Sequence, residues 1–242
     1  MTTRRRRTTA TLVFGMVLSA TAAGAQTVDE IVALHYQSRG GQEAWKAIET
    51  QRMTGTIHAQ GIEIALVSLS RRPHLMRQEL TLEIPGTGPV HIVNIFDGKT
   101  AWSLNPMSGS SSFQELTGLE AQRMRDQSAF DSPLMGFKDR GYTVEIAGRT
   151  DLDGRTAHHL RITRPDEPVM HLYIDAVTGS ELRIDVDGPA PTRVTLSDHR
   201  LVAGGVLMPH HISLEQGGMQ SEVIVSSIEF DVPIDDSAFK AP

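Results

Sequence analysis

The chain has 242 residues, no cysteine and a formal net charge of −6, and only 5% of its residues are aromatic. Without cysteine it can form no disulfide, use no thiolate chemistry and carry no lipid on an N-terminal cysteine. An acidic chain without a basic stripe is a poor binder of nucleic acid, so we expect no such partner and attribute the acidity to solubility.

The first 25 residues have the pattern of a secretory signal peptide. Arg4 to Arg7 form a positive segment, residues 11–23 form a mostly apolar one, and Ala23-Gly24-Ala25 is a cleavage motif. The apolar segment is too short to span a membrane as a helix. We therefore expect Gln26 to begin a soluble exported chain of 217 residues (242 − 25), with a single domain over residues 26–242.

Two short helices are predicted next. Thr27-Val28-Asp29-Glu30 is a capping box, in which the threonine and glutamate side chains satisfy backbone amides of the first turn. Gly40-Gly41 ends this helix, because glycine readily adopts the left-handed conformation found there. Residues 42–49 form a second helix around Trp45. His35 stands alone on an apolar helix face, which favours a half-buried core residue over a ligand.

A first set of strands is predicted over residues 51–104. Apolar and polar side chains alternate along most of it, which is the period of a strand with one buried face. Val90 to Phe96 is mostly apolar on both faces, as is typical of a central strand. Asp97-Gly98 predicts a hairpin turn before the strand that carries Trp102.

The period changes over residues 117–140, which we expect to be a helical insertion between two sets of strands. Thr117-Gly118-Leu119-Glu120 predicts a second capping box and a helix as far as about Ser128. A further helix is predicted from Asp131 or Ser132 to residue 140, with a proline at its first position. Isolated helices of this length are unstable in water, so the insertion must lie on the sheet.

Residues 142–231 show the clearest alternation in the chain. Met170 to Asp175 and Leu182 to Asp187 each place an apolar side chain at every second position, and turn residues separate such segments. Consecutive strands of this kind form an antiparallel meander with one apolar face. Together the two sets give about eleven strands, so the predicted fold class is mainly β, with minor helix.

Recognisable catalytic and metal-binding motifs are absent from the sequence. The ten histidines include two adjacent pairs, His158-His159 and His210-His211. Neighbouring residues of a strand point to opposite faces, so neither pair can easily share an ion. No zinc-binding H-E-x-x-H, P-loop, dinucleotide fingerprint or nucleophile elbow occurs. We therefore expect no catalytic residue, no metal, no cofactor and no enzymatic activity.

A more specific pattern lies in residues 72–106. Arg72-Pro73-His74-Leu75 is followed by Asp97-Gly98-Lys99-Thr100-Ala101-Trp102 and then by Asn105-Pro106. This arrangement resembles the N-terminal signature of the periplasmic lipoprotein-carrier family, the LolA-like proteins. The order of elements, with an N-terminal helix, strands, central helices and further strands, is similar to that family over nearly all of the expected mature chain.

The resemblance implies a fold and the parts of a binding site. The family fold is an incomplete antiparallel β-barrel, and a helical lid on its concave side encloses a hydrophobic cavity for acyl chains. Residues 117–140 would supply the lid, and Arg72 matches the strand arginine that helps to hold the family's lid shut. The helical region at 28–49 and the longer loops depart from the classical carriers.

Combined with the strand alternation, this resemblance predicts which residues surround the cavity. Apolar strand positions would line it, and the insertion would close it. The predicted cavity residues are Leu80, Leu82, Phe96, Trp102, Leu172, Ile174, Leu182 and Ile184. The predicted lid residues are Arg72, Leu119, Met124, Leu134, Met135 and Phe137.

The sequence thus predicts a monomeric periplasmic carrier or chaperone for lipid, lipoprotein acyl chains or another hydrophobic ligand, acting in lipoprotein sorting and outer-membrane biogenesis. Its partners would be that ligand and inner- or outer-membrane receptor proteins. Burial of an acyl chain contributes about 0.8 kcal/mol per CH₂, so binding needs no covalent chemistry. The alternative is a periplasmic sensor that uses the same half-barrel to detect mislocalised lipid or peptide.

Overall fold

The computed structural model describes residues 26–165 and 167–241, and the predicted signal peptide lies outside this range. Within it, thirteen strands form one antiparallel sheet, accompanied by three α-helices and three 3-10 turns. This mostly β architecture with few helices confirms the predicted fold class. The sheet has two strands more than the eleven or so predicted; one that the prediction missed is β6, which has three residues and is too short to show alternation.

The bounds of the elements are as follows. The helices are α1 (Val28–Ser38), α2 (Gln42–Ala47) and α3 (Gly118–Ser128), and the 3-10 turns are η1 (Pro106–Ser108), η2 (Ala203–Gly205) and η3 (Asp236–Phe239). The strands are β1 (Thr50–Ala59), β2 (Ile62–Arg71), β3 (Leu75–Ile84), β4 (Gly88–Asp97), β5 (Ala101–Leu104), β6 (Gln114–Leu116), β7 (Thr143–Leu152), β8 (Arg155–Thr163), β9 (Met170–Asp175), β10 (Glu181–Val186), β11 (Thr192–Val202), β12 (Val206–Gln216) and β13 (Met219–Phe230).

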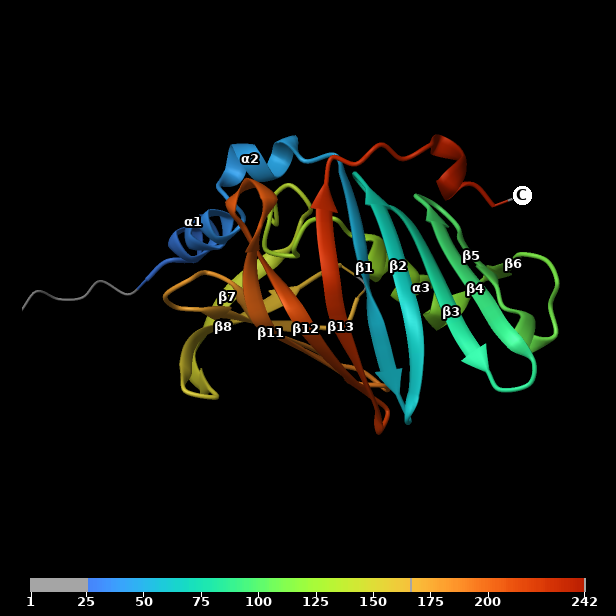
Figure 1. The fold of residues 1–242 in the computed structure, drawn as a ribbon. Coiled ribbons are helices and arrows are strands. Elements are labelled where there is room, and N and C mark those ends of the chain that lie inside the picture. The colour runs from blue at the N-terminus through green and yellow to red at the C-terminus, as the bar shows by residue number, and fades with distance from the viewer. Residues whose placement is uncertain (1–25, 166, 242) are drawn as a thin grey trace, which may run out of the picture.

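The sheet is built outward from its centre, in the order β6-β5-β4-β3-β2-β1-β13-β12-β11-β10-β9-β8-β7. The chain enters at β1, runs to the β6 edge, crosses to the β7 edge and returns to the centre, where β13 pairs with β1 (Figure 1). The sheet does not close, because β6 and β7 remain edges.

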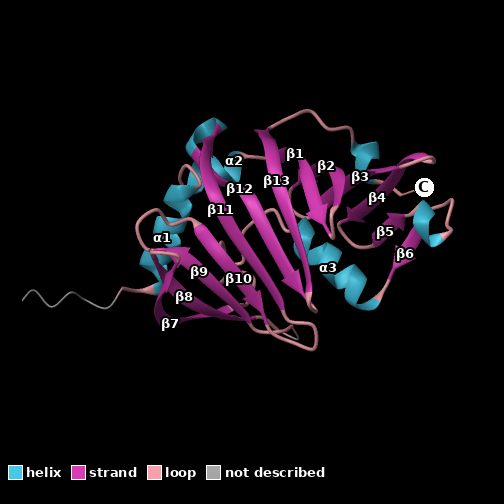
Figure 2. Ribbon diagram, turned by 60° about the horizontal axis from the view of Figure 1, so that its bottom comes forward, coloured by secondary structure: helices cyan, strands magenta, loops and turns pink. Residues whose placement is uncertain are grey.

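Residues 117–142, which we call the crossing segment, connect the two edges of the sheet. Its helix α3 lies on one side of the sheet, and Figure 2 shows the strands spread above it. We call this side the concave face and the opposite side the outer face. α1 and α2 lie at one end of the β7–β13 half (Figure 1).

The ends of the helices agree only partly with the sequence prediction. The capping box of α1 is confirmed, with the Thr27 and Glu30 side chains each bonded to the other's backbone amide. Thr117 precedes α3 without a side-chain cap, so the second capping box is wrong. The second helix of the insertion is also wrong, because residues 133–141 form successive turns. Gly136 has a φ of 62° there, which interrupts helical geometry.

The turn between β4 and β5 explains much of the Asp97-to-Trp102 motif. Asp97 Oδ1 accepts hydrogen bonds from the amides of Lys99 (2.9 Å) and Thr100 (2.7 Å), and its Oδ2 accepts one from Trp102 Nε1 (3.2 Å). Partial burial by itself would raise the pKa of Asp97, but these hydrogen bonds outweigh it and lower that pKa. The motif therefore fixes a hairpin.

Replacement of Asp97 by alanine is expected to lower the free energy of unfolding by about 1 kcal/mol, because the turn loses its side-chain acceptor. Urea unfolding at neutral pH measures this change. Asp139→Ala is the matched control, since Asp139 is exposed and has no such hydrogen bond among the described residues. Equal stability of the two variants would show that the Asp97 turn contributes nothing.

Candidate functional site

The strand register decides which side chains face the concave side in the first half of the sheet. Phe96 of β4 packs against Met124 of α3, so it faces this side. Its cross-strand partner on β3 is Met76. Because side chains alternate along a strand, Leu80 and Leu82 face the same way. Of the predicted cavity residues in this half, Leu80, Leu82 and Phe96 therefore share one face.

In the second half, three predicted cavity residues also share the concave face. Leu172 and Ile174 belong to a buried cluster with Leu134 of the crossing segment and Ile31 of α1, and Ile184 packs against it. Both Leu172 and Ile174 are 0% exposed. They support the crossing segment, and a ligand could contact them only if that segment moved.

The structure does not bring Trp102 and Leu182 to this face. Trp102 pairs with Ile95 on the outer face, one position out of phase with Phe96. Leu182 packs with Tyr173 on the outer face as well. A β-bulge between Glu181 and Arg183 inserts one extra residue there, which breaks the alternation on which its prediction rested.

The predicted lid residues are distributed over different environments. Met124, Leu134 and Met135 are buried, each in a different hydrophobic cluster. Phe137 is half-buried, and Leu119 is 55% exposed. The crossing segment is therefore attached along its length, although Leu119 points into solvent.

A continuous row of apolar side chains, which we call the apolar strip, crosses the open part of the concave face. Five of its seven members are only half-buried, so the helices leave this row uncovered. Neighbouring members are direct cross-strand partners from β11 through β13 and β1 to β4. They are Leu196, Ile212, Val223, Ile57, Ile64, Leu82 and Val90. Sequence reasoning missed most of them, because the row exists only through the pairing of β1 with β13.

Arg72, which follows β2, connects the sheet to α2 and to the crossing segment. Its Nη1 lies 2.7 Å from Asp131 Oδ2, its Nε donates to the Ile48 carbonyl (2.7 Å), and its Nη2 donates to the Trp45 carbonyl (3.0 Å). Its guanidinium also lies 4.4 Å from the centre of the Phe130 ring. The Arg72 side chain is 15% exposed and that of Asp131 is 37% exposed, so the arginine end of this ion pair is shielded from solvent.

Glu181, in the other half of the sheet, binds Ser132, the residue that follows Asp131 in the crossing segment. The bulge turns its carboxylate to the concave side, where it accepts hydrogen bonds from Ser132 Oγ and from Arg39 Nη2 (3.2 Å). His35 Nε2 lies 3.7 Å from the same carboxylate. Asp131 and Ser132 are therefore held from opposite halves of the sheet.

Burial dominates the electrostatics of this cluster. Burial lowers the pKa of His35, and the Glu181 carboxylate and the Gly179 carbonyl only partly offset it. His35 Nδ1 lies 2.9 Å from that carbonyl, to which a neutral ring donates. Burial by itself would raise the pKa of Glu181, but His35, Arg39 and the Ser132 hydroxyl lower it. Burial therefore favours a neutral ring at His35, beside a Glu181 carboxylate that Arg39 also contacts.

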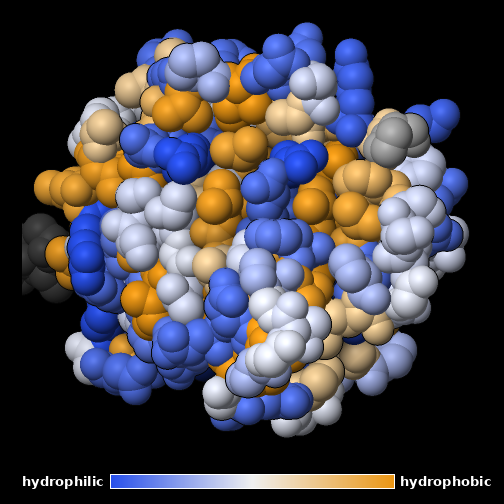
Figure 3. All heavy atoms as spheres, turned by 45° about the vertical axis from the view of Figure 1, so that its right-hand side comes forward, coloured by the Kyte–Doolittle hydropathy of each residue, from blue (hydrophilic) through white to orange (hydrophobic). Residues whose placement is uncertain are grey.

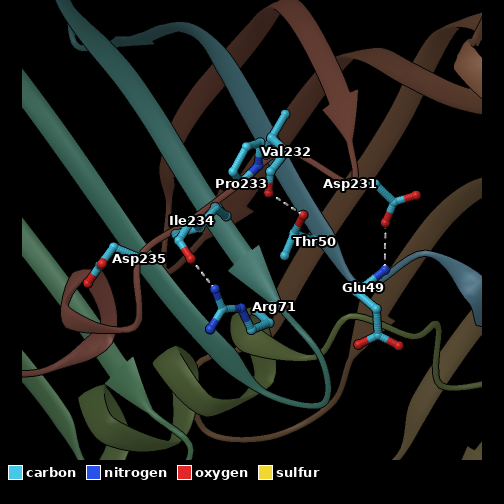
Figure 4. A pocket seen from close by; sticks show the side chains of 8 residues that line it. All are labelled: Glu49, Thr50, Arg71, Asp231, Val232, Pro233, Ile234 and Asp235. Atoms are coloured by element: carbon cyan, nitrogen blue, oxygen red, sulfur yellow. Dashed lines mark hydrogen bonds between the residues drawn. The ribbon is translucent and has the colours of Figure 1, made fainter.

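A separate pocket of about 630 Å³ lies on the outer face, where the chain passes from β13 to η3 (Figure 4). The Glu49 amide donates to Asp231 (2.9 Å), Thr50 Oγ1 donates to the Val232 carbonyl (2.7 Å), and Arg71 donates to the Ile234 carbonyl. These bonds attach the C-terminal segment to the start of β1 and the end of β2. The pocket is thus on the opposite side of the sheet from the apolar strip.

The surface around the β4–β6 edge has no single chemical character. In Figure 3, which brings this side forward, apolar residues are interspersed with charged and polar ones. No helix among residues 26–165 and 167–241 is long and apolar enough to cross a membrane. The same residues contain no group of three or more His, Cys, Asp or Glu side chains placed to hold a metal ion.

No family model matches the chain, and no curated protein matches it in sequence. Solved structures do match. A DUF1329 family protein from Desulfovibrio piger has a TM-score of 0.62 at 12% identity, covering 89% of this chain and 98% of that one. A LolA superfamily protein from Nitrosomonas europaea has a TM-score of 0.60 at 15% identity, covering 89% and 98%. The chain has the LolA-like fold.

A third solved structure agrees with this assignment. It comes from Vibrio parahaemolyticus and is described as an outer membrane lipoprotein-sorting protein domain; its TM-score is 0.61 at 11% identity, covering 88% of this chain and 97% of that one. The resemblance inferred from residues 72–106 is therefore confirmed at the level of the fold. The identities are low, so the likeness concerns the backbone arrangement and not the ligand.

The buried neutral His35 is expected to make the protein less stable as the pH falls below about 6.5. In the unfolded chain a histidine binds a proton below that pH. In the folded protein the pKa of His35 is lowered, so its ring stays neutral to a lower pH. The unfolded state then binds more protons, so the free energy of unfolding decreases with falling pH. Urea unfolding at several pH values between 5 and 8 measures this dependence. The free energy of unfolding should change less with pH for His35→Gln than for wild type.

The control for this experiment is His58→Gln, since His58 is an exposed histidine beside Glu63. For this variant the free energy of unfolding should depend on pH as it does for wild type. Other buried histidines contribute to the wild-type pH dependence as well, so the difference between the two variants is the quantity that matters. The same pH dependence of the free energy of unfolding in His35→Gln and His58→Gln would contradict a buried neutral His35.

Proposed function

We propose that this protein is a periplasmic carrier that binds a lipid, a lipoprotein acyl chain or another hydrophobic ligand on the concave side of its sheet. The apolar strip is the observation that carries this proposal. Its seven side chains follow one another across seven strands, yet most of them remain partly open to solvent. Strands lie about 4.8 Å apart, so such a row is about 29 Å long, which suits an extended acyl chain.

The energetics of such binding are favourable without covalent chemistry. Each buried CH₂ contributes about 0.8 kcal/mol, so a dozen of them contribute about 10 kcal/mol before the cost of immobilising the chain is subtracted. Half-buried Ile and Val side chains can gain this contact without a rearrangement of the sheet. The proposal therefore assigns the protein binding and transport, with no catalytic step.

The crossing segment would act as the lid of this site. It begins over Phe96 through Met124 and is held midway by Arg72 and Glu181. The apolar strip lies on the same concave face, so movement of the segment would change how much of a bound chain is covered. Arg72 is the natural point of control, because it contacts the crossing segment and α2 together.

The cellular setting of the proposal rests on two supports. Residues 1–25 have the pattern of a secretory signal, and the Vibrio parahaemolyticus domain of the same fold is described as lipoprotein-sorting. We therefore place residues 26–242 in the periplasm, as a single-domain monomer that exchanges its ligand with inner- or outer-membrane receptor proteins.

Replacement of Ile64 by glutamate should abolish binding of an apolar ligand. Ile64 is the fifth of the seven members of the apolar strip and is half-buried, so a carboxylate there can reach water but repels a hydrocarbon chain. We expect binding of a fluorescent fatty acyl probe to weaken at least about tenfold, equivalent to about 1.4 kcal/mol. Titration of the probe, alongside thermal melts, measures both effects.

Ala65→Glu is the matched control, because Ala65 is exposed on the outer face of the same strand. It should bind the probe like wild type. If both glutamate variants bind like wild type, the strip is not the binding surface. If wild type binds no apolar probe, the carrier proposal fails.

Arg72→Gln should accelerate release of the probe while leaving the sheet folded. The variant loses the ion pair with Asp131 and the cation–π contact with Phe130, which favour the closed crossing segment. Hydrogen bonds to charged groups are worth about 1.5–3 kcal/mol, so release should become about ten times faster or more. Stopped-flow displacement gives the rate, and Arg77→Gln, on the outer face, is the control. An unchanged rate would remove Arg72 from lid control.

A further inference from the structure

A second row, made of uncharged polar side chains, lies on the concave face between α3 and the apolar strip. Along β4, Phe96 lies under Met124, Asn94 comes next, and Ile92 and Val90 follow toward the strip. Asn94 is the polar residue of this series, and its cross-strand partners on the neighbouring strands are polar as well. The members of this second row, which we call the polar row, are Ser68 of β2, Gln78 of β3, Asn94 of β4 and Ser103 of β5.

The polar row is incompletely hydrogen-bonded. Ser103 Oγ donates to Asn94 Oδ1 at 2.8 Å. The Ser68 hydroxyl, the Gln78 amide and the Asn94 amide nitrogen have no hydrogen-bond partner among the residues that the structure describes. The residue Ser68 as a whole is 7% exposed. These groups therefore face the concave space with free donors and acceptors.

A ligand that covers these groups must replace their water. A buried polar group without a partner costs on the order of 1–3 kcal/mol, so a plain hydrocarbon lying across the row would be penalised. An ester or amide linkage would instead bond to the hydroxyls and amides. The row contains no charged side chain, and it therefore offers nothing to neutralise a carboxylate or a phosphate.

We propose that the polar row is a specificity element that selects acyl ligands carrying a neutral hydrogen-bonding linkage, an ester or an amide. The linkage lies against Gln78 and Asn94, and the acyl chain continues past Ile92 to the apolar strip. This inference rests on the proposed function, since it concerns the same ligand. It adds the position of the linkage, which lies between α3 and the β2–β4 part of the apolar strip.

The test compares four ligands of equal chain length: a monoacylglycerol, an N-acylethanolamine, a fatty acid and an alkane. Each displaces a fluorescent apolar probe from wild type and from the Gln78→Leu/Asn94→Leu double variant. Wild type should prefer the ester or the amide over the alkane by about tenfold, corresponding to one or two hydrogen bonds. The double variant should lose this preference and bind the alkane at least as well as wild type does.

Gln220→Leu is the matched control, because Gln220 is exposed on the outer face and undergoes the same kind of substitution. It should keep the wild-type preference. Thermal melts verify that the double variant is folded, and the single variants Gln78→Leu and Asn94→Leu serve if it is not. The affinities of the monoacylglycerol and the N-acylethanolamine show whether the polar row favours an ester or an amide.

Three outcomes would overturn the inference. Equal affinity of wild type for alkane and ester would show that the row does not select, and so would an unchanged preference in the leucine variants. A preference for the fatty acid would show that the site favours an anion. In each of these cases the protein still binds a hydrophobic ligand, so the proposed function survives. Binding of none of the four ligands would overturn that function itself.

Discussion

Antiparallel pairing of β1 with β13 is the constraint on which the rest of the structure depends. These strands are the first and the last of the sheet in sequence, and their register joins Gln51–Ala59 to Ser221–Phe230. A Cβ on Gly55 would lie 2.5 Å from the Ile224 carbonyl oxygen, so the close approach at this bulge requires glycine. Without this pairing the apolar strip would be divided into two short pieces, one on each half of the sheet.

The same topology explains how the crossing segment is held. A chain that leaves the sheet at β6 and re-enters at β7 must pass from one edge of the sheet to the other, and here it does so on the concave side (Figure 2). Its consecutive residues Asp131 and Ser132 are held by Arg72 from one half and by Glu181 from the other. Trp45 connects the two contacts, because Arg39 and Arg72 both lie near its ring and its Nε1 donates to Asp131. The segment is therefore fixed where the halves meet, and the strip beyond it stays open.

Part of the candidate site followed from local patterns. Alternation placed Leu80 and Leu82 in phase with each other, and Asp97-Gly98 marked a turn, because both features depend on neighbours in the chain. The same reasoning failed for Leu182, since a bulge shifts the phase without leaving a sequence signal. It also failed for Trp102, which is one residue out of phase with Phe96 and bonds to the turn aspartate. Arg72 was found only through the resemblance, because nothing in its local sequence indicates its partners.

The sequence by itself determined the class of the protein: alternating strands with an apolar face, a helical interruption after the first set, and no recognisable catalytic motif. These are properties of residues within a few positions of one another, and backbone geometry converts them directly into strands and turns. Only the tertiary structure decided what the concave face displays. Both the apolar strip and the polar row are aligned by cross-strand register, between residues as far apart as Ile57 and Val223. A shift of one residue would turn either set to the other face, so the surface that would meet a ligand exists only once the strands are paired.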